Sequence, residues 1–343
     1  MRRLLVTGGA GFIGSNFVHL CRAAHPQAEI TVLDALTYAG DRRNLEGAGE
    51  VHFVEGDIRD TALVRSLLRE RGLDCIVNFA AETHVDRSIS GPSVFVETNV
   101  LGTQSLLEAA RAEWLDEGTG RPHRFHQVST DEVFGSLGPD DAPCTERSLY
   151  APNSPYSASK AGADHMVRAY RETYGLETTT SFCSNNYGPR QYPEKLIPAF
   201  LSGILQGRPL PLYGDGLNIR DWLHVSDHCR GIVAILDTGA AGESYNLSGG
   251  RALTNRALVE QLCAAVDAAF AGDPALAKRF PQAPGARGAA SHELVHFVAD
   301  RPGHDRRYAI DDTKARETLG YSPKVAFETG LTETVAWYLR RAL

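Results

Sequence analysis

A glycine-rich segment near the start of the chain, Thr7–Gly14 (TGGAGFIG), constrains the fold more than any other feature. It directly follows a short apolar run, Arg3–Thr7, and opens a stretch with helical periodicity. Gly8 suits a tight turn, Gly11 lets the backbone approach a pyrophosphate, and Gly14 allows a helix to pack closely on a strand. The free N–H groups at the helix N-terminus would bind the diphosphate. The segment therefore predicts a dinucleotide site at the end of a β-strand.

Short apolar runs alternate with longer amphipathic stretches through the first half of the chain. This alternation is typical of right-handed βαβ units with parallel strands. We expect a Rossmann-type α/β fold, a doubly wound parallel sheet whose ligands bind beyond the carboxyl ends of the strands. The predicted strands are Arg3–Thr7, Glu29–Asp34, Val51–Glu55, Cys75–Phe79, Arg124–Ser129 and Thr178–Cys183, and the predicted helices are Gly11–Ala24, Thr61–Arg71, Pro92–Trp114 and Tyr156–Tyr174.

The pattern changes after Pro189, where predicted strands become few. We expect a smaller α/β substrate domain, interleaved with the first: residues 1–190 and about 222–250 would bind the cofactor, and residues 191–221 and 251–343 the substrate. Residues 271–290 are rich in Ala, Gly and Pro without periodicity, which indicates a loop. The predicted helices are Lys195–Gln206, Val225–Asp237, a helix capped by Thr254 and running to about Phe270, Asp311–Leu319 and Phe327–Leu343, and the predicted strands are Leu210–Tyr213 and Glu243–Leu247.

The composition restricts the class of protein. The chain has 35 Lys and Arg against 42 Asp and Glu, a net charge of −7, which argues against a nucleic-acid-binding protein. Its six cysteines form no C-x-x-C pair and suit a reducing compartment. No run approaches the ~20 apolar residues of a membrane span. The N-terminal apolar run is too short for a signal peptide. We expect a cytoplasmic globular protein that binds neither nucleic acid nor membrane.

Asp34 ends the second predicted strand, twenty residues beyond Gly14. Its carboxylate suits a ribose 2′-hydroxyl and repels a 2′-phosphate, which favours NAD over NADP. Two nearby basic residues, Arg42 and Arg43, leave this choice open. Asp57, at the end of the third strand, would either meet the adenine end of the cofactor or cap the next helix.

Tyr156 and Lys160 lie four residues apart and therefore share one face of a predicted helix. An ammonium group beside a phenol lowers the phenol pKa from about 10, which makes the phenol a usable base near neutral pH. Thr130 ends a strand upstream and would supply a hydroxyl to the same site. Two acids follow it directly, Asp131 and Glu132. Paired acids indicate more than a simple redox step, because one can donate a proton to a leaving group while the other abstracts a C–H proton.

Together with the glycine loop, these residues resemble the extended short-chain dehydrogenase/reductase family, and within it the nucleotide-sugar 4,6-dehydratases. The resemblance covers nearly the whole chain. The sequence departs from the family pattern at Phe134, where the family usually has Tyr, at Phe182, where it commonly has Arg, and in residues 271–290. The segments that carry it are 78–88 (NFAAETHVDRS), 183–189 (CSNNYGP), 193–198 (PEKLIP), 218–222 (NIRDW) and 300–308 (DRPGHDRRY).

The resemblance implies a reaction on dTDP-glucose with NAD as cofactor. Tyr156, helped by Lys160 and Thr130, would take the C4 hydroxyl proton while NAD⁺ accepts the C4 hydride. Glu132 would then remove the C5 proton, and a protonated Asp131 would donate to the departing C6 hydroxyl. Return of the hydride to C6 gives dTDP-4-keto-6-deoxy-glucose. The cofactor is regenerated in each turnover and should stay bound.

The resemblance also implies the binding residues, and a homodimer formed through the helices at 92–114 and 156–174. Arg220 and Arg301 would bind the diphosphate by paired hydrogen bonds. The implied cofactor-binding residues are Gly8, Gly11, Phe12, Ile13, Gly14, Asp34, Thr37, Asp57, Ile58, Ala80, Ala81, Thr98, Tyr156 and Lys160. The implied substrate-binding residues are Thr83, Ser88, Asn185, Asn186, Lys195, Leu196, Pro211, Tyr213, Arg220, Asn255, Arg301 and His304.

One motif points elsewhere. His292–His296 (HELVH) matches the H-E-x-x-H signature of zinc proteases, which needs both histidines on one helix face. Here the motif follows a Gly- and Pro-rich stretch and leads into a strand-like pattern, and Pro302 stands where a third histidine would be needed. We expect no metal site.

Two alternatives remain open from the sequence. The chain could be another NAD-dependent nucleotide-sugar enzyme of the family: a UDP-sugar dehydratase, a 4-epimerase or a decarboxylase. It could also be a non-catalytic NAD-sensing protein on the same fold. The pair Asp131 and Glu132 argues against an epimerase, and the intact Thr130, Tyr156 and Lys160 argue against a sensor.

Overall fold

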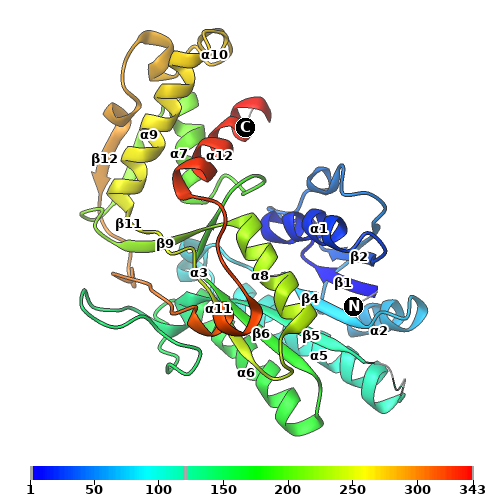
Figure 1. Ribbon diagram of the computed structural model, residues 1–343. Coiled ribbons are helices and arrows are strands. Elements are labelled where there is room, and N and C mark those ends of the chain that lie inside the picture. Colours follow the sequence, from blue (N-terminus) through cyan, green and yellow to red (C-terminus); the bar gives the residue numbers. More distant parts are fainter. Residues whose placement is uncertain (1–2, 119, 121, 342–343) are drawn as a thin grey trace.

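A seven-stranded sheet forms the larger part of the computed structural model, which describes residues 3–118, 120 and 122–341 (Figure 1). Its strand order is β10-β6-β5-β4-β1-β2-β3, and neighbouring strands are parallel. The order reverses between β1 and β4, so ligands are expected at their carboxyl ends. The strands are β1 (Arg3–Thr7), β2 (Glu29–Asp34), β3 (His52–Glu55), β4 (Cys75–Asn78), β5 (Arg124–Thr130), β6 (Thr178–Cys183) and β10 (Ser244–Leu247).

Helices cover both faces of this sheet because its strands are apolar on both sides. Leu4 and Val6 of β1 pack in one core with α1 and α8, whereas Leu5 packs in a second core with α2, α5 and α6. This doubly wound arrangement confirms the predicted fold class. The helices are α1 (Phe12–Ala24), α2 (Thr61–Glu70), α5 (Gly102–Arg111), α6 (Pro155–Tyr174) and α8 (Val225–Thr238), and α5 lies between π-helical segments η2 (Val96–Leu101) and η3 (Ala112–Asp116).

A smaller part lies at the top of Figure 1 and has its own core between α7 (Leu196–Leu205), α9 (Asn255–Gly272) and α12 (Phe327–Arg341). The chain leaves this part after β9, returns to the large sheet through α8 and β10, and then re-enters it at β11. This path confirms the predicted interleaving. The small sheets contain β7 (Asn185–Tyr187), β9 (Ile219–His224) and β11 (Ala252–Thr254), and β8 (Leu210–Tyr213) with β12 (Val295–Val298).

The predicted strands of the large sheet are confirmed to within one residue at each end. The helix cap at Thr254 is also confirmed, because its hydroxyl accepts the Ala257 N–H at 3.1 Å. One short helix, α3 (Val85–Ser90), and the strands β7, β9 and β11 escaped prediction, whereas α4 (Ser93–Phe95) lies within the helix predicted over 92–114. The last helix was predicted to reach Leu343, but residues 342–343 lie outside the described residues.

The prediction of a loop over residues 271–290 is wrong. The segment holds α10 (Ala275–Arg279) and a 3₁₀ turn, η5 (Pro284–Arg287). Pro274 precedes α10 and Pro284 opens η5, positions where proline costs no helix hydrogen bond. Leu276 and Ala283 are buried in the smaller core. Apolar burial therefore orders a segment that lacks helical periodicity.

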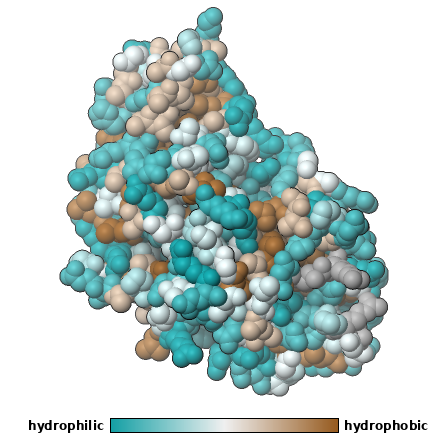
Figure 2. Space-filling view, in the orientation of Figure 1, coloured by the Kyte–Doolittle hydropathy of each residue, from teal (hydrophilic) through white to brown (hydrophobic). Residues whose placement is uncertain are grey.

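On the face in Figure 2, hydrophilic residues predominate and hydrophobic ones occur in small groups. Within residues 3–118, 120 and 122–341, no helix combines the length and the apolar character needed to cross a bilayer.

Candidate active site

A cavity of about 390 Å³ opens at the carboxyl ends of the parallel strands. Its wall contains every predicted catalytic residue and every predicted cofactor residue, together with four predicted substrate residues. These are Gly8, Gly11, Phe12, Ile13, Gly14, Asp34, Thr37, Asp57, Ile58, Ala80, Ala81, Thr98, Thr130, Asp131, Glu132, Tyr156 and Lys160, and Thr83, Asn185, Asn186 and Lys195.

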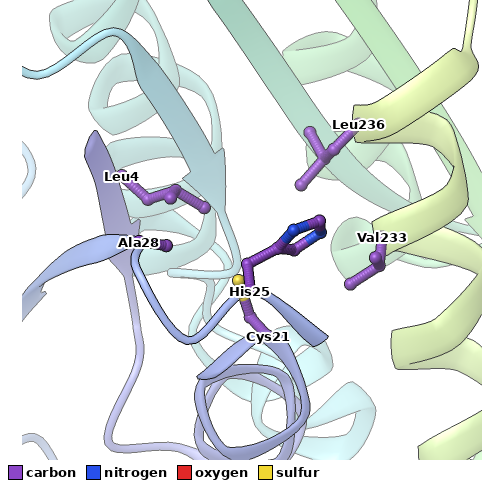
Figure 3. Close-up of a pocket in the computed structure, with 6 residues that line it drawn as sticks. All are labelled: Leu4, Cys21, His25, Ala28, Val233 and Leu236. Atoms are coloured by element: carbon purple, nitrogen blue, oxygen red, sulfur yellow. The ribbon is translucent and has the colours of Figure 1, made fainter. Parts of the chain in front are cut away.

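A second void, between α1 and α8, is too small to hold a ligand. Its volume is about 10 Å³, room for at most about one water. Figure 3 shows the His25 ring extending between the two helices, and its Nε2 lies 3.1 Å from Asp237 Oδ2. The other lining residues are Leu4, Cys21, Ala28, Val233 and Leu236.

The remaining predicted substrate residues do not line the cavity. Three of them gather beside it: Arg301 Nη1 lies 3.4 Å from Asp86 Oδ1, and the Tyr213 hydroxyl lies 3.4 Å from Asp86 Oδ2. The His304 ring meets the Tyr213 ring edge-on at 6.2 Å. Arg220 stacks over Tyr308 at 4.2 Å. The other four lie on α3, α7, β8 and α9: Ser88, Leu196, Pro211 and Asn255.

The glycine loop takes the predicted conformation. Gly8 has φ +64°, and a Cβ there would lie 2.7 Å from the Ala80 nitrogen. A Cβ on Gly14 would collide with the Gly8 carbonyl oxygen. No side chain caps the α1 N-terminus at Gly11, so its first N–H groups face the cavity rim. The loop thus has the shape of a diphosphate cradle.

Asp34 fixes the loop as well as facing the cavity. Its carboxylate accepts hydrogen bonds from the Ala10 and Leu36 N–H groups, both at 2.9 Å. Burial raises the Asp34 pKa, and the two hydrogen bonds oppose that rise. Neither Arg42, which stacks on Phe53 at 4.4 Å, nor Arg43, paired with Asp41, lines the cavity. The structure thus gives neither arginine a contact with the cavity wall.

Asp57 does not cap the following helix. The cap of α2 is Asp60, whose side chain accepts the Leu63 N–H at 2.9 Å. Asp57 instead pairs with Arg59, with 2.7 Å between Oδ2 and Nη2, and this pairing lowers the Asp57 pKa. Both residues line the cavity, which is compatible with the predicted cofactor-side role of Asp57.

Tyr156 and Lys160 share a face of α6, but the phenol pKa does not show the expected net fall, because burial outweighs any effect of the ammonium. The Lys160 ammonium donates to the Val128 carbonyl oxygen at 2.7 Å. Burial raises the Tyr156 pKa well above its usual value, and Glu132 adds to the rise. Burial also lowers the Lys160 pKa. The spacing of Tyr156 and Lys160 in the sequence predicted that the two side chains are neighbours, but it could not predict that both are buried.

The adjacent acids occupy different electrostatic environments. Asp131 is 3% exposed, and burial followed by repulsion from Glu132 raises its pKa well above the usual range. Burial raises the Glu132 pKa too, but three cations oppose this rise: Arg220, Lys195 and Arg301. These surroundings favour the proton on Asp131, and the roles of the two acids stay a prediction.

Several residues at the site escaped sequence reasoning. Glu194 and Tyr192 line the cavity next to the predicted Lys195; Glu194 lies inside the segment 193–198 that carries the resemblance, and Tyr192 directly precedes it. Cys183 and Ser129 line it from the ends of β6 and β5. Being the last or next-to-last residue of a parallel strand is the signal that could have found them.

The H-E-x-x-H segment does not form an α-helix. His292 lies in a 3₁₀ turn, η6 (Ser291–Leu294), and His296 lies in β12. Within the part of the chain that the structure describes, no three His, Cys, Asp or Glu side chains come together as a metal site.

A doubly wound sheet, a glycine cradle and a buried Tyr–Lys pair at one cavity define a dinucleotide-dependent enzyme of the extended short-chain dehydrogenase/reductase class. The GDP-mannose 4,6 dehydratase family matches residues 5–334. A curated dTDP-glucose 4,6-dehydratase of Xanthomonas campestris pv. campestris (strain B100) is 50% identical, over 99% of this chain and 93% of its own. The dTDP-glucose 4,6-dehydratase of Neisseria meningitidis serogroup B is 46% identical, over 99% of this chain and 94% of its own. The chain belongs to the dTDP-glucose 4,6-dehydratase family.

Solved structures agree with this assignment. DesIV, a dTDP-glucose 4,6-dehydratase from Streptomyces venezuelae solved with NAD bound, has a TM-score of 0.85 and 50% identity, covering 99% of this chain and 97% of its own. The UDP-glucose 4-epimerase of Thermotoga maritima has a TM-score of 0.82 at 27% identity, covering 98% and 99%. The fold is thus shared across the class, and the high sequence identity separates the dehydratases from the epimerases.

Proposed function

We propose that this chain is an NAD-dependent hydro-lyase that converts dTDP-glucose to dTDP-4-keto-6-deoxy-glucose. The observation that carries the proposal is the pair Asp131 and Glu132 in the cavity wall beside Tyr156 and Lys160. Oxidation and reduction at C4 alone need only a base and a cofactor, whereas elimination of water across C5 and C6 needs an acid and a second base. The family relatives support the same reaction.

The residues present fit NAD. The positions of Gly8 and Gly14 exclude any side chain, which leaves the cradle open to a diphosphate. Asp34 lies at the end of β2, where a carboxylate suits the adenosine ribose. When bound, NAD supplies the hydride acceptor at C4 and the hydride donor at C6.

In the oxidation step, Tyr156 takes the C4 hydroxyl proton, and its phenol must lose a proton first. Thr130 helps, because a hydrogen bond from its hydroxyl lowers the Tyr156 pKa. Lys160 helps through its positive charge, which favours the phenolate. All three side chains are buried in the cavity wall.

In the elimination step, the new 4-ketone acidifies the C5 proton. Glu132 removes that proton, since Arg220 and Lys195 favour its ionised form. Asp131 holds its own proton and donates it to the departing C6 hydroxyl. Glu132 then returns a proton to C5. The proton that Tyr156 took from the C4 hydroxyl leaves to solvent, and Asp131 takes up a proton, which restores the starting ionisation states.

The residues proposed to hold the nucleotide sugar form a cationic side of the site. Lys195 lies in the cavity wall, and Arg220 and Arg301 lie close enough to lower the Glu132 pKa. Two arginines suit a diphosphate because each can donate paired hydrogen bonds. Tyr213 and His304 would contact the base and its ribose. The other proposed contacts are Thr83, Ser88, Asn185, Asn186, Leu196, Pro211 and Asn255.

We also propose the domain division given above, a homodimer and a cytoplasmic location. The separate cores around α1 and α9 support the division.

The exposed apolar side chains of Val96 (49%) and Leu101 (53%), on the segment that packs beside α6, support the dimer. Sedimentation velocity of wild type and Leu101→Glu tests it: one species at the monomer mass in both would reject the dimer. The six cysteines, buried as free thiols, suit a reducing cytoplasm, which cell fractionation tests.

The function is tested by NMR of the purified holoenzyme with dTDP-glucose in D₂O, without added NAD. We expect a 4-keto-6-deoxy product with deuterium at C5, because Glu132 exchanges its proton with solvent. Unchanged sugar would reject the proposal. A dTDP-galactose product would indicate a 4-epimerase, and conversion of UDP-glucose but not dTDP-glucose would indicate a UDP-sugar dehydratase.

A further inference from the structure

Asp164 is a fully buried carboxyl group that the mechanism above does not use. It lies on α6 one helical turn beyond Lys160, so both side chains face the end of β5. Its Oδ2 accepts hydrogen bonds from the Ser129 hydroxyl at 2.5 Å and the Tyr150 hydroxyl at 3.4 Å. Its Oδ1 has no hydrogen-bond partner. A buried, half-satisfied carboxyl group is costly, so it calls for a reason.

One consequence of this contact is mechanical. Lys160 binds the Val128 carbonyl oxygen and Asp164 binds the Ser129 hydroxyl, so two side chains of α6 hold successive residues of β5. The next residue of the strand is Thr130, which acts on the Tyr156 phenol. Displacement of this strand end would therefore displace the oxidation machinery.

A second consequence is electrostatic. Burial lowers the pKa of the Lys160 ammonium. Among the groups that oppose this fall, Asp164 has the largest effect. Burial raises the Asp164 pKa to about 7, and Lys160 with the two hydroxyl hydrogen bonds holds it from rising further. The other titratable groups that face this pair are Cys183 on β6, beside Lys160, and Tyr150 before α6, beside Asp164; Asp131 and Glu132 on η4 (Asp131–Phe134) face Tyr156.

We propose that Asp164 is a positioning residue that holds Lys160 as an ammonium and fixes the end of β5 during C4 oxidation. The proposal rests on the proposed function, because it assigns Asp164 to the first step of that reaction. Ionised Asp164 stabilises the ammonium, and the ammonium favours the Tyr156 phenolate. Asp164 itself contacts neither substrate nor cofactor.

The test is the pH dependence of nicotinamide reduction in a single turnover, after rapid mixing of holoenzyme with dTDP-glucose. In Asp164→Asn the ammonium loses its counter-charge. The Lys160 pKa should fall and the Tyr156 pKa should rise, so both limbs of the pH profile move inward. We expect the rate near pH 8 to fall roughly tenfold or more, since one pKa unit changes the reactive population tenfold.

Ser129→Ala provides a milder variant that keeps the carboxyl group. Loss of the 2.5 Å hydrogen bond should raise the Asp164 pKa, so only the acid limb should move, to higher pH. The matched control is Ser181→Ala on β6, which loses a buried hydrogen bond to His126 (3.1 Å) and should keep the wild-type limbs. The Ser129 variant decides the question if Asp164→Asn does not fold.

The outcomes separate the two proposals. Lower rates with unmoved limbs in both Asp164→Asn and Ser129→Ala would mean a structural role and would overturn this inference. A wild-type enzyme that makes no keto product from dTDP-glucose would instead overturn the proposed function.

Discussion

At the scale of single residues, neighbours in sequence differ because their surroundings differ. Asp131 and Glu132 are adjacent, yet Asp131 faces Glu132 and Asp221 while Glu132 faces three cations. Sequence reasoning found both acids from their position after Thr130. It also found Tyr156 and Lys160 from helical spacing. It could not find the raised Tyr156 pKa or the Lys160 hydrogen bond to Val128, because both depend on burial.

The different roles of the two acids give the first prediction. Glu132→Gln should lower product formation by roughly 100-fold or more, because the C5 proton loses its base. Reduction of the nicotinamide by substrate should remain detectable, since Tyr156 and Lys160 are intact. Absorbance of the reduced nicotinamide and NMR of the sugar measure the two steps separately.

Asp131→Asn is the matched control for that prediction. It should also stop elimination, because the C6 hydroxyl loses its proton donor, but it should retain deuterium exchange at C5. The assignment of roles would be reversed if Glu132→Gln exchanged C5 and Asp131→Asn did not.

At the scale of elements, strand length alone did not decide predictability, because β9 has six residues and was missed. Strands β1, β2 and β6, with five or six residues, were predicted with their observed bounds. Strands β7 and β11 have three residues each, too few to show alternation, and they exist because β9 lies between them. The segment at 271–290 was missed for a related reason, since isolated apolar residues order it through contact with α9.

The pairing of β5 and β6 encloses a polar side chain and gives the second prediction. His126 is fully buried and its ring bonds to Thr179 (3.0 Å) and Ser181 (3.1 Å). Burial lowers its pKa from 6.5 to about 3. The unfolded chain therefore binds a proton at His126 more readily than the folded chain does. The free energy of unfolding decreases for this reason as pH falls from 6.5 toward 3. The loss is up to about 1.4 kcal/mol per pH unit for one such group.

His126→Gln should flatten this dependence, because glutamine can hydrogen-bond to both hydroxyls without titrating. Urea unfolding across the acid range measures the slope. The same substitution at His52, an exposed residue of β3, is the control and should leave the slope at the wild-type value. Parallel curves for wild type and His126→Gln would contradict the prediction.

At the scale of the whole molecule, the cavity is completed by loops from both parts of the chain. Tyr38 follows β2 in the larger part, and its hydroxyl lies 3.3 Å from Oε1 of Glu194, which precedes α7 in the smaller part. The Arg87 guanidinium stacks on the Tyr38 ring at 4.2 Å. Lys195 donates to the Thr83 carbonyl oxygen at 2.7 Å. The sequence predicted that the two parts interleave, but residues 156 positions apart showed no pattern that would pair them.

Because these contacts join the larger and the smaller part of the chain beside the cavity, we expect them to slow the release of the cofactor. Tyr38→Phe should speed NAD dissociation roughly tenfold, because the lost hydrogen bond leaves the Glu194 carboxylate less satisfied in a buried position. Dissociation is measured by diluting the holoenzyme into excess competing dinucleotide and following the bound fraction. The control is Tyr174→Phe, which removes the hydroxyl from a ring at the end of α6 that is 48% exposed and lies outside the cavity wall, and which should release NAD at the wild-type rate. Equal rates for the two variants would mean that the glycine loop and Asp34 alone retain the cofactor.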